Sequence, residues 1–367
     1  MPIVLSSVPV VRVLNGDCRE VLKTLPDGSV NCCVTSPPYF GLRDYGTAKW
    51  EGGDPACDHK QGRNGAGRAD GIVDERGQRN RDGVGAMGGD CKRCGARRVD
   101  SQIGLEPTPE AYVAQMVAVF REVRRVLRDD GTLWLNLGDS YCRIGHKKSS
   151  SGYGTTGLAG GKAQEHTPLR RENNVPGLKH KDLIGIPWRV AFALQADGWY
   201  LRQDIIWHKP NPMPESVTDR CTKAHEYIFL LSKSERYWFD SEAMKEPATS
   251  PPMRPRNKAE EGWHEGCGSS NCAPGDRVWG ESETRNRRSV WTVATKPYKG
   301  AHFATFPSTL IEPCILAGCP KGGVVLDPFG GSGTTGEVAK KHGRAAILVE
   351  LNPDYLPLIH DRTNKES

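Results

Sequence analysis

The order of apolar and polar positions along the chain predicts an α/β protein. Within residues 10–39 the pattern predicts a strand, a helix that starts at Asp17, and a buried strand at 30–34, which together form one βαβ unit. Near the other end, apolar runs at 324–326 and 345–349 predict two more buried strands. Runs without polar alternation are typical of parallel strands that helices cover on both faces.

Helical periodicity is clearest after Thr108. This residue is a candidate N-cap, Pro109 takes the first helical position, and apolar residues recur at helical spacing as far as Leu127. We expect this amphipathic helix to cover the sheet and to end at Gly131, with a buried strand following at 132–137.

The remaining predicted elements lie in the second half of the chain. They are helices at 187–196, at 308–318 and from about Thr334, and strands at 200–207, 226–231 and 236–240. The strands at 226–231 and 236–240 are expected to pair as a hairpin or as antiparallel neighbours.

Three stretches show no such periodicity. Residues 47–104 are rich in Gly, Arg and Asp, and 143–180 are rich in Gly, Ser, Lys and Asn. Residues from about 246 to 298 carry Pro, Gly, Trp and clusters of arginine. We interpret the first as an insertion and the second as a positively charged loop.

Composition narrows the class of protein. The 367 residues fit one large α/β core with insertions, and 50 Lys+Arg against 44 Asp+Glu give a net charge of +6, which is compatible with a nucleic-acid partner without establishing one. No apolar run is long enough to cross a bilayer and no basic segment precedes the first apolar stretch, so we expect no membrane association and a cytoplasmic protein. Twelve cysteines without a secretory signal favour reduced thiols or metal ligands over disulfides.

Two polar loops follow buried strands at opposite ends of the sequence. Thr-Ser-Pro-Pro-Tyr at 35–39 follows one strand, and Asp-Pro-Phe-Gly-Gly-Ser-Gly-Thr-Thr at 327–335 follows another. Both loops should open at the same sheet edge, where open α/β sheets bind ligands. A glycine-rich turn admits a ligand close to the backbone, and Glu350 at the next strand end can accept hydrogen bonds from ribose hydroxyls. The chain lacks a Walker lysine, which counts against a nucleotide-binding Rossmann protein.

The two loops resemble the signature motifs of amino-group DNA methyltransferases, which methylate the exocyclic nitrogen of cytosine or adenine with S-adenosylmethionine. The catalytic motif precedes the cofactor motif, as in the β arrangement of that family. The resemblance implies a Rossmann-like methyltransferase fold with a mixed, mostly parallel sheet. It divides the chain into a catalytic core of 1–46, 105–240 and 299–367, an insertion at 47–104, and a target-recognition region at 241–298.

The resemblance also implies which residues bind S-adenosylmethionine. They are Asp17, Phe306, Asp327, Phe329, Gly330, Gly331, Ser332, Gly333, Thr334, Thr335, Glu350 and Asn352. Asp17 matches the position that meets the adenine amino group, and Glu350 matches the ribose ligand.

The catalytic residues implied by the resemblance are Ser36, Pro37, Pro38 and Tyr39. An exocyclic amine is a poor nucleophile because its lone pair is delocalised into the ring. Ser36 and the Pro37 carbonyl would accept hydrogen bonds from the amine, and Tyr39 would stack on a base flipped out of the duplex. Methyl transfer would be a direct displacement.

The acceptor amine and the class of substrate stay open at this point. Serine in the first motif position favours cytosine N4, and adenine N6 is the alternative. A protein glutamine methyltransferase and a non-catalytic DNA-binding protein are further alternatives. The resemblance at both ends of the sequence and the two basic irregular stretches disfavour the first, and the complete cofactor and catalytic motifs disfavour the second. Cys314 after Pro313 superficially suggests the nucleophile of a cytosine-carbon methyltransferase, but its apolar helical surroundings favour a structural cysteine.

Double-stranded DNA is the partner that the resemblance implies. The candidate contacts are Trp207, Lys209, Arg285, Arg287 and Arg288. For Trp207 and Lys209, a buried tryptophan and a solvated lysine are the alternative. A cognate restriction endonuclease is an open question, as is the choice between monomer and homodimer.

Four residues of the insertion have the types and spacing of a tetrahedral zinc site. Cys57 and His59 form one pair, and Cys91 and Cys94 form a second with the tight spacing of a zinc knuckle. We predict structural zinc here, with free thiols or a redox pair as alternatives. Cys267 and Cys272 form a weaker pair without evident partners.

Overall fold

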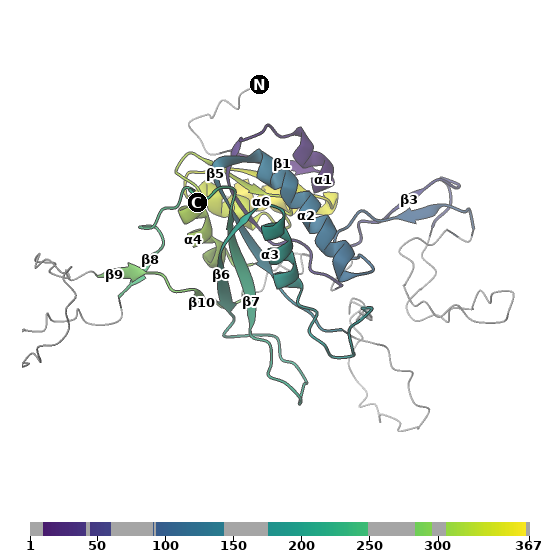
Figure 1. Ribbon diagram of the computed structural model, residues 1–367. Helices are drawn as coiled ribbons and strands as arrows, with labels where there is room; N and C mark the ends of the chain where they lie inside the picture. Colours follow the sequence, from purple (N-terminus) through teal and green to yellow (C-terminus); the bar gives the residue numbers. More distant parts are fainter. Residues whose placement is uncertain are drawn as a thin grey trace, which may run out of the picture.

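The computed structural model describes residues 10–41, 45–59, 91, 93–142, 175–248, 283–295 and 306–364. Its centre is an eight-stranded sheet of order β1-β12-β11-β2-β5-β7-β6-β10 (Figure 1). The strands are β1 (Val11–Asn15), β2 (Val30–Thr35), β5 (Leu127–Leu137), β6 (Tyr200–His208), β7 (His225–Ser232), β10 (Val290–Thr292), β11 (Val324–Asp327) and β12 (Ala345–Glu350). Strand β7 is antiparallel to β5 and β6, and every other pair in this sheet is parallel. The expected mixed, mostly parallel sheet is confirmed.

Helices cover both faces of the sheet. One face packs against α1 (Cys18–Val21), α2 (Pro109–Val126) and α3 (Ile186–Ala196), and the other against α4 (Ser308–Gly318), α5 (Thr334–Lys341) and α6 (Leu356–Asn364). Two short 3-10 helices, η1 (Leu22–Thr24) and η2 (Pro353–Tyr355), complete the helical elements of the described chain. The pleat of β5 separates the two cores, because Leu133 and Leu135 face the first while Trp134 faces the second. The result is a three-layer α/β/α core.

The start of α2 is as expected, but its end is not. The Thr108 hydroxyl accepts a hydrogen bond from the Ala111 amide at 3.1 Å, with Pro109 at the first helical position. The helix stops at Val126, and Gly131 lies inside β5 instead of ending the helix. A Cβ on Gly131 would lie 2.9 Å from the Arg128 carbonyl oxygen and 3.1 Å from the Asn31 carbonyl oxygen, so this glycine permits close approach both of the preceding turn of chain and of the neighbouring strand β2.

The expected strand at 236–240 is absent from the described chain, and the predicted hairpin is wrong. The Trp238 amide donates to the Asp130 carbonyl and the Asp240 amide to the Ala317 carbonyl, at 2.9 and 3.0 Å. Because these amides bind two different elements, no ladder with β7 forms. The antiparallel partners of β7 are instead β5 and β6.

Two small ribbons lie outside the main sheet. One pairs β3 (Lys49–Glu51) with β4 (Arg97–Val99), and the other pairs β8 (Lys245–Pro247) with β9 (Thr284–Asn286). They belong to the intervals assigned to the insertion and the target-recognition region, although β10 of the latter interval joins the main sheet. Most of the predicted loop at 143–180, and both Cys267 and Cys272, lie outside the described residues. Among the helices described, none is long and apolar enough to cross a membrane.

Candidate functional site

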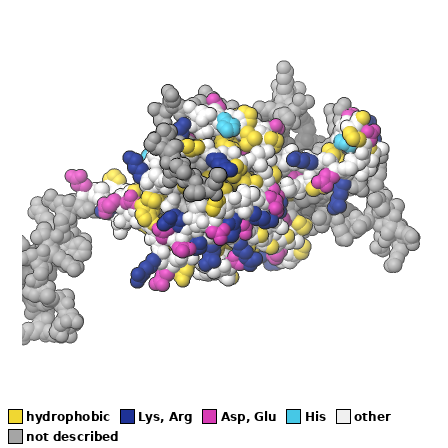
Figure 2. All heavy atoms as spheres, turned by 90° about the horizontal axis from the view of Figure 1, so that it is seen from above, with side chains coloured by type: hydrophobic (Ala, Val, Ile, Leu, Met, Phe, Trp, Pro, Cys, Tyr) yellow, Lys and Arg dark blue, Asp and Glu magenta, His cyan; other side chains and the backbone are white. Residues whose placement is uncertain are grey.

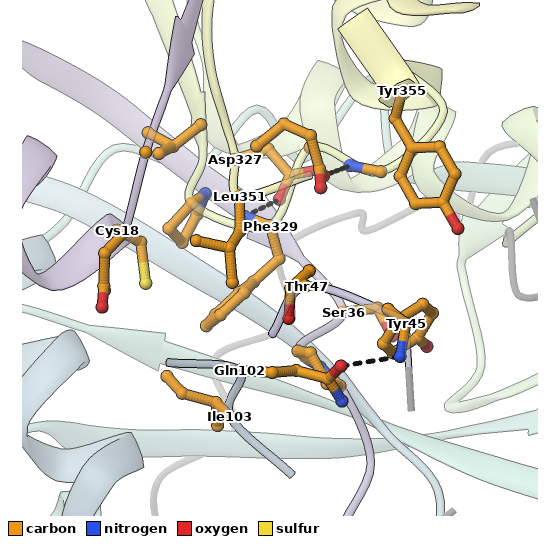
Figure 3. A pocket seen from close by; sticks show the side chains of 18 of the residues that line it. Cys18, Ser36, Tyr45, Thr47, Gln102, Ile103, Asp327, Phe329, Leu351 and Tyr355 are labelled. Atoms are coloured by element: carbon orange, nitrogen blue, oxygen red, sulfur yellow. Dashed lines mark hydrogen bonds between the residues drawn. The ribbon is translucent and has the colours of Figure 1, made fainter. Parts of the chain in front are cut away.

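A cavity opens at the carboxyl ends of β1, β2, β11 and β12, where the two sequence motifs meet. Its walls include Ser36 and Pro38 from the loop after β2, and Asp327 to Ser332 from the loop after β11. Figure 3 shows Ser36, Asp327 and Phe329 around the same space. Sequence positions almost 300 residues apart therefore form one site, as the common sheet edge predicted.

Asp327 joins the two motifs. Its carboxylate accepts hydrogen bonds from the hydroxyls of Thr35 and Thr335, both at 2.6 Å, and from the Phe329 amide at 3.0 Å. The residue is 1 % exposed, and burial raises the pKa of its carboxyl group although these hydrogen bonds oppose that shift. Asp327 thus holds the end of β2, the glycine-rich loop and the start of α5 together.

The glycine-rich loop has the backbone that its sequence predicts. Gly331 and Gly333 have φ values of 52° and 82°, which glycine adopts without strain, and Gly333 precedes the first turn of α5. Nine of the twelve predicted cofactor residues line the cavity, including Asp17, Phe306 and Ser332. Gly333, Thr335 and Asn352 do not line the cavity. Thr335 supports it indirectly, because its hydroxyl donates a hydrogen bond to the wall residue Asp327.

Glu350 ends β12 and lines the same cavity. One carboxylate oxygen accepts the Gly331 amide and the other accepts the Asn352 amide, each at 2.8 Å. Burial raises the pKa of Glu350 to about 7, with the nearby Asp327 carboxylate adding to the shift. The Asn352 side chain in turn caps η2 by accepting the Asp354 amide at 3.0 Å, so the carboxylate sits in a fixed turn.

Glu350→Gln is expected to remove a pH dependence from folding. Because the folded-state pKa is raised from 4.5 to about 7, the penalty for ionising this group is absent below pH 4.5 and grows until about pH 7. Relative to the variant, the native protein should therefore lose on the order of 3 kcal/mol of unfolding free energy over that window. Denaturant titrations from pH 4.5 to 8 measure this, and Glu20→Gln, at an exposed surface residue, is the control. Parallel pH profiles for the native protein and Glu350→Gln would contradict the burial argument.

Asp17 is both a helix cap and a wall residue. Its carboxylate accepts the Arg19 amide at 2.9 Å and forms an ion pair with the Arg19 guanidinium at 2.5 Å. Burial opposes the charge, but the hydrogen bonds and positive charge of Arg19 hold the pKa of Asp17 below its ordinary value. The adjacent Gly16 amide donates to the Glu350 carbonyl, which places the loop after β1 beside the end of β12.

The loop at 35–39, predicted to be catalytic, is held by side chains from other parts of the chain. The Tyr112 hydroxyl donates to the Pro38 carbonyl at 2.9 Å. The Tyr39 hydroxyl lies 2.6 Å from a carboxylate oxygen of Glu226, 3.1 Å from the side-chain oxygen of Asn136, and 3.5 Å from the Ser36 hydroxyl. Burial, followed by the Glu226 charge, raises the pKa of Tyr39, so this phenol stays protonated and donates.

Sequence reasoning missed Glu226 and Asn136. Asn136 interrupts the apolar end of β5, and Glu226 stands directly before the apolar run of β7; these polar positions beside buried residues were the signal available. Lys209 forms an ion pair with the second carboxylate oxygen of Glu226. We call Tyr39, Asn136, Lys209 and Glu226 the tyrosine cluster.

Gly138 completes the setting of Tyr39. A Cβ added there would lie 2.5 Å from a ring carbon of Tyr39, so the ring rests directly against the backbone after β5. The ring position is thereby fixed by packing as well as by the hydroxyl.

Of the predicted DNA contacts, Lys209 belongs to the tyrosine cluster and Trp207 lies beside it. Trp207 is 3 % exposed, its indole N–H donates to the Val293 carbonyl at 2.8 Å, and the Lys209 ammonium lies 4.3 Å from the ring centroid. These contacts favour the alternative of a buried tryptophan. The Lys209 ammonium is paired with the Glu226 carboxylate, so it is not free to bind a DNA phosphate.

The three predicted arginine contacts lie on or after β9. Arg285 and Arg288 both donate to one carboxylate oxygen of Glu246 at 2.9 Å, and the Arg287 guanidinium lies 5.1 Å from the Trp291 ring centroid. The Arg288 side chain is 68 % exposed, so its ion pair with Glu246 is open to competition from another anion. Their contact with DNA stays a prediction.

Cys314 is the structural cysteine that its surroundings suggested. It is 1 % exposed within α4, and burial raises the pKa of the thiol far above its ordinary value. A thiol so disfavoured as thiolate is not an activated nucleophile.

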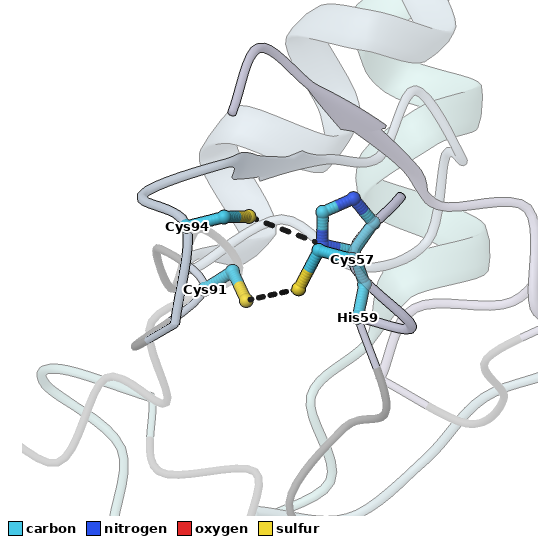
Figure 4. A group of neighbouring side chains, drawn as sticks. All are labelled: Cys57, His59, Cys91 and Cys94. Carbon is cyan, nitrogen blue, oxygen red and sulfur yellow. Dashed lines mark hydrogen bonds between the residues drawn. The ribbon is translucent and has the colours of Figure 1, made fainter. Parts of the chain in front are cut away.

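The four predicted metal ligands come together at the β3–β4 ribbon. Their ligand atoms all lie within 4.8 Å of one another, with Cys57 Sγ 3.8 Å from Cys91 Sγ and Cys94 Sγ 3.4 Å from His59 Nδ1 (Figure 4). A tetrahedral zinc ion with ordinary Zn–S and Zn–N bonds separates its ligand atoms by about 3.4–3.8 Å. The donor set and its spacing therefore fit Zn²⁺.

Comparison with known proteins places the chain in a family. The model of the N6/N4 methyltransferase family, described as DNA methylase, matches residues 30–361. The Type II methyltransferase M.Cfr9I of Citrobacter freundii is 41% identical over 96% of this chain and 88% of its own length. The Type II methyltransferase M.SmaI of Serratia marcescens is 40% identical over 96% of this chain and 90% of its own length.

Solved structures share the fold. The PvuII DNA methyltransferase (cytosine-N4-specific) superposes with a TM-score of 0.54 at 16% identity, over 99% of this chain and 92% of that one. A putative DNA modification methylase of Thermus thermophilus, complexed with S-adenosyl-L-methionine, gives 0.50 at 21% identity, over 98% and 96%. The chain therefore belongs to the N6/N4 DNA methylase family, as an S-adenosylmethionine-dependent DNA methyltransferase that acts on an exocyclic amino group.

Proposed function

We propose that the acceptor is the exocyclic N4 amine of cytosine in a specific sequence of duplex DNA. The observation that carries this proposal is the position of Ser36, which opens into the cofactor cavity and lies 3.5 Å from the Tyr39 hydroxyl. A serine hydroxyl can accept a hydrogen bond from the amine without adding a negative charge. Adenine N6 is the alternative acceptor.

The loop around Ser36 is arranged to align an amine. Proline at 37 fixes φ and removes a competing donor, and the Tyr112 hydroxyl holds the Pro38 carbonyl. We propose that the Ser36 hydroxyl and the Pro37 carbonyl each accept a hydrogen bond from one N–H of the amine. These bonds draw the nitrogen lone pair out of its delocalisation into the ring. Alignment and electrostatics then supply the rate, and no covalent enzyme intermediate is needed.

The flipped base is proposed to stack on Tyr39. A base leaves the duplex at a cost of a few kcal/mol, and stacking on an aromatic ring returns about 1–3 kcal/mol. The tyrosine cluster and Gly138 keep the ring in one position, so little side-chain entropy is lost when the base arrives.

The cavity residues fit S-adenosylmethionine. We propose that Glu350 accepts hydrogen bonds from the ribose hydroxyls, that Asp17 meets the adenine amino group, and that the glycine-rich loop lies along the methionine part; all three contribute to the cavity wall. When bound, S-adenosylmethionine supplies the electrophilic methyl group. The aromatic rings of Phe306, Phe329 and Tyr355 add apolar surface to the cavity wall.

We further propose that Cys57, His59, Cys91 and Cys94 hold a structural Zn²⁺ ion. The ribbon that carries them has three residues in each strand, which is too little to be stable alone.

Residues 241–298, including Arg285, Arg287 and Arg288, are the proposed target-recognition region. The names of the relatives as Type II methyltransferases support a cytoplasmic restriction-modification role with a cognate endonuclease.

Mass spectrometry of nucleosides tests the acceptor assignment. Unmethylated bacterial genomic DNA, which offers every short sequence many times, is incubated with the protein and S-adenosylmethionine and then digested. N4-methylcytosine is the expected product, and the Ser36→Ala, Tyr39→Ala double variant should give none. N6-methyladenine would reassign the base. An absence of both products, with cofactor binding demonstrated, would overturn the proposal.

A further inference from the structure

The proposed zinc site and the cofactor cavity are the two ends of one structural unit. We call residues 45–59 and 93–103, with Cys91, the ribbon arm; it contains β3 and β4. Its tip carries the four metal ligands, and its base supplies Tyr45, Thr47, Ser101, Gln102 and Ile103 to the cavity wall. Figures 1 and 2 show the arm at the right, extending away from the main sheet.

The metal ligands of the tip lie in turns that contact the strands of the ribbon. The His59 ring stacks on Trp50 of β3 with centroids 5.1 Å apart, and a Cβ on Gly53 would lie 2.8 Å from Cys94 Sγ. The ligand turns are therefore packed directly on the strands. Without a metal ion the four ligand groups have only weak contacts with one another, and short two-stranded ribbons are marginal in water.

The base is joined across its two segments by hydrogen bonds. The Thr47 hydroxyl donates to Asp100 Oδ1 at 2.8 Å, and the Gln102 amide donates to the same oxygen at 3.1 Å. The Tyr45 amide donates to the Gln102 side-chain oxygen at 2.7 Å, as Figure 3 shows. The Asp100 side chain is 2 % exposed, so one buried carboxylate fixes both halves of this wall.

The base is also attached to the cofactor loops. Arg19, the ion-pair partner of Asp17, donates to the Ser101 carbonyl at 3.0 Å. The backbone N–H of Asn352 donates to the Glu350 carboxylate, and the Asn352 side-chain amide donates to the Tyr45 carbonyl at 3.3 Å. The contacts that position the two acidic wall residues therefore continue into the arm.

From this continuity we infer that metal binding at the tip and S-adenosylmethionine binding at the base of the ribbon arm are thermodynamically coupled. The metal orders the arm and thereby pre-forms one wall of the cavity, so the arm loses less conformational entropy when the cofactor binds. Thermodynamic linkage requires the reciprocal effect: bound cofactor must raise the affinity of the protein for the metal by the same factor. The inference rests on the cofactor and zinc sites proposed above.

Two binding measurements on the full chain test the coupling. The affinity for S-adenosylmethionine is measured by calorimetry on zinc-loaded protein and on protein stripped with a chelator. The affinity for Zn²⁺ is measured by competition with a chromophoric chelator, with and without saturating S-adenosylmethionine. Removing zinc should weaken cofactor binding by roughly tenfold, and the cofactor should tighten zinc by that same factor.

Asp100→Ala separates coupling from ligation. This variant keeps all four metal ligands but removes the acceptor that joins the two segments of the base. It should still bind one zinc ion, while the ratio of cofactor affinities with and without zinc falls towards one. Glu51→Ala removes an exposed carboxylate from the same ribbon and should keep the native ratio. If Asp100→Ala does not fold, the two measurements on the native chain still decide the question.

The outcomes distinguish this inference from the proposals on which it rests. Equal cofactor affinities with and without bound zinc would overturn the coupling and leave both sites standing. Failure to bind zinc would overturn the metal site and the coupling but not the methyltransferase. Failure of zinc-loaded protein to bind S-adenosylmethionine would overturn the proposed cofactor site itself.

Discussion

Tyr39→Ala is expected to slow methyl transfer by about 10²-fold or more while leaving the affinity for S-adenosylmethionine nearly unchanged. The ring would no longer stack on the base, and the base would lose the fixed surface that aligns its amine with the methyl group. Tyr39 does not itself line the cavity, and its hydroxyl lies closer to Glu226 and Asn136, at 2.6 and 3.1 Å, than to the wall residue Ser36, at 3.5 Å. Single-turnover rates and calorimetric cofactor affinities measure the two effects separately.

Tyr39→Phe is the matched control. It keeps the ring against Gly138 but removes the hydroxyl that donates to Glu226, while Lys209 still balances that carboxylate. The loss of rate should be roughly tenfold, because one hydrogen bond to a charged group is removed and the stacking surface remains. An equal loss of rate in both variants would assign the role of Tyr39 to its hydroxyl. If Tyr39→Ala lost as much cofactor affinity as it lost rate, the loop at 35–39 would not act on the base alone. That result would contradict the assignment of base alignment to this loop and of cofactor binding to the loop at 327–335.

Asp327→Ala is expected to have the largest effect on stability and on cofactor binding together. The change leaves the hydroxyls of Thr35 and Thr335 and the Phe329 amide without their buried acceptor. Each unsatisfied buried group costs about 1–3 kcal/mol, so the unfolding free energy should fall by on the order of 3 kcal/mol or more. The glycine-rich loop would lose its anchor, and the affinity for S-adenosylmethionine should drop on the order of 100-fold.

Denaturant unfolding and calorimetry measure the two effects of Asp327→Ala. Asp129→Ala is the control, because the Asp129 side chain is 95 % exposed and pairs only at the surface with Lys233. If Asp327→Ala bound the cofactor normally while being less stable, Asp327 would be a structural residue alone. Asp327→Asn tests the charge, since it preserves the shape of the side chain but can no longer accept at both positions.

The parts of the fold that the sequence predicted are those with a local signal. The N-cap at Thr108, the helix at 308–318 and the glycine turn before α5 each depend on neighbouring residues. The meeting of the two motifs was predicted from a rule about parallel strands and not from any pairwise contact.

The errors and omissions have a shared physical origin in non-local contacts. Gly131 has the sequence context of a helix end, but its role is to allow the approach of β2, which lies about 100 residues earlier. Residues 236–240 have the apolar content of a strand, yet two separate elements bind their amides. Glu226 reaches Tyr39 across 187 positions, and no spacing rule links the two.

The arrangement of the sheet sets the order in which this protein can fold during synthesis. The central strand β2 is made early, but one of its two partners is β11, and β1 pairs with β12, some 335 residues further along the chain. The nascent chain therefore carries an apolar strand with one open edge until β11, almost 300 residues later, has left the ribosome. The Asp327 carboxylate, which accepts a hydrogen bond from the Thr35 hydroxyl, is also made late. A ribosome-stalled or truncated product that ends before Val324 would carry the loop at 35–39 but would lack the glycine-rich loop and Glu350, which form another part of the cavity wall.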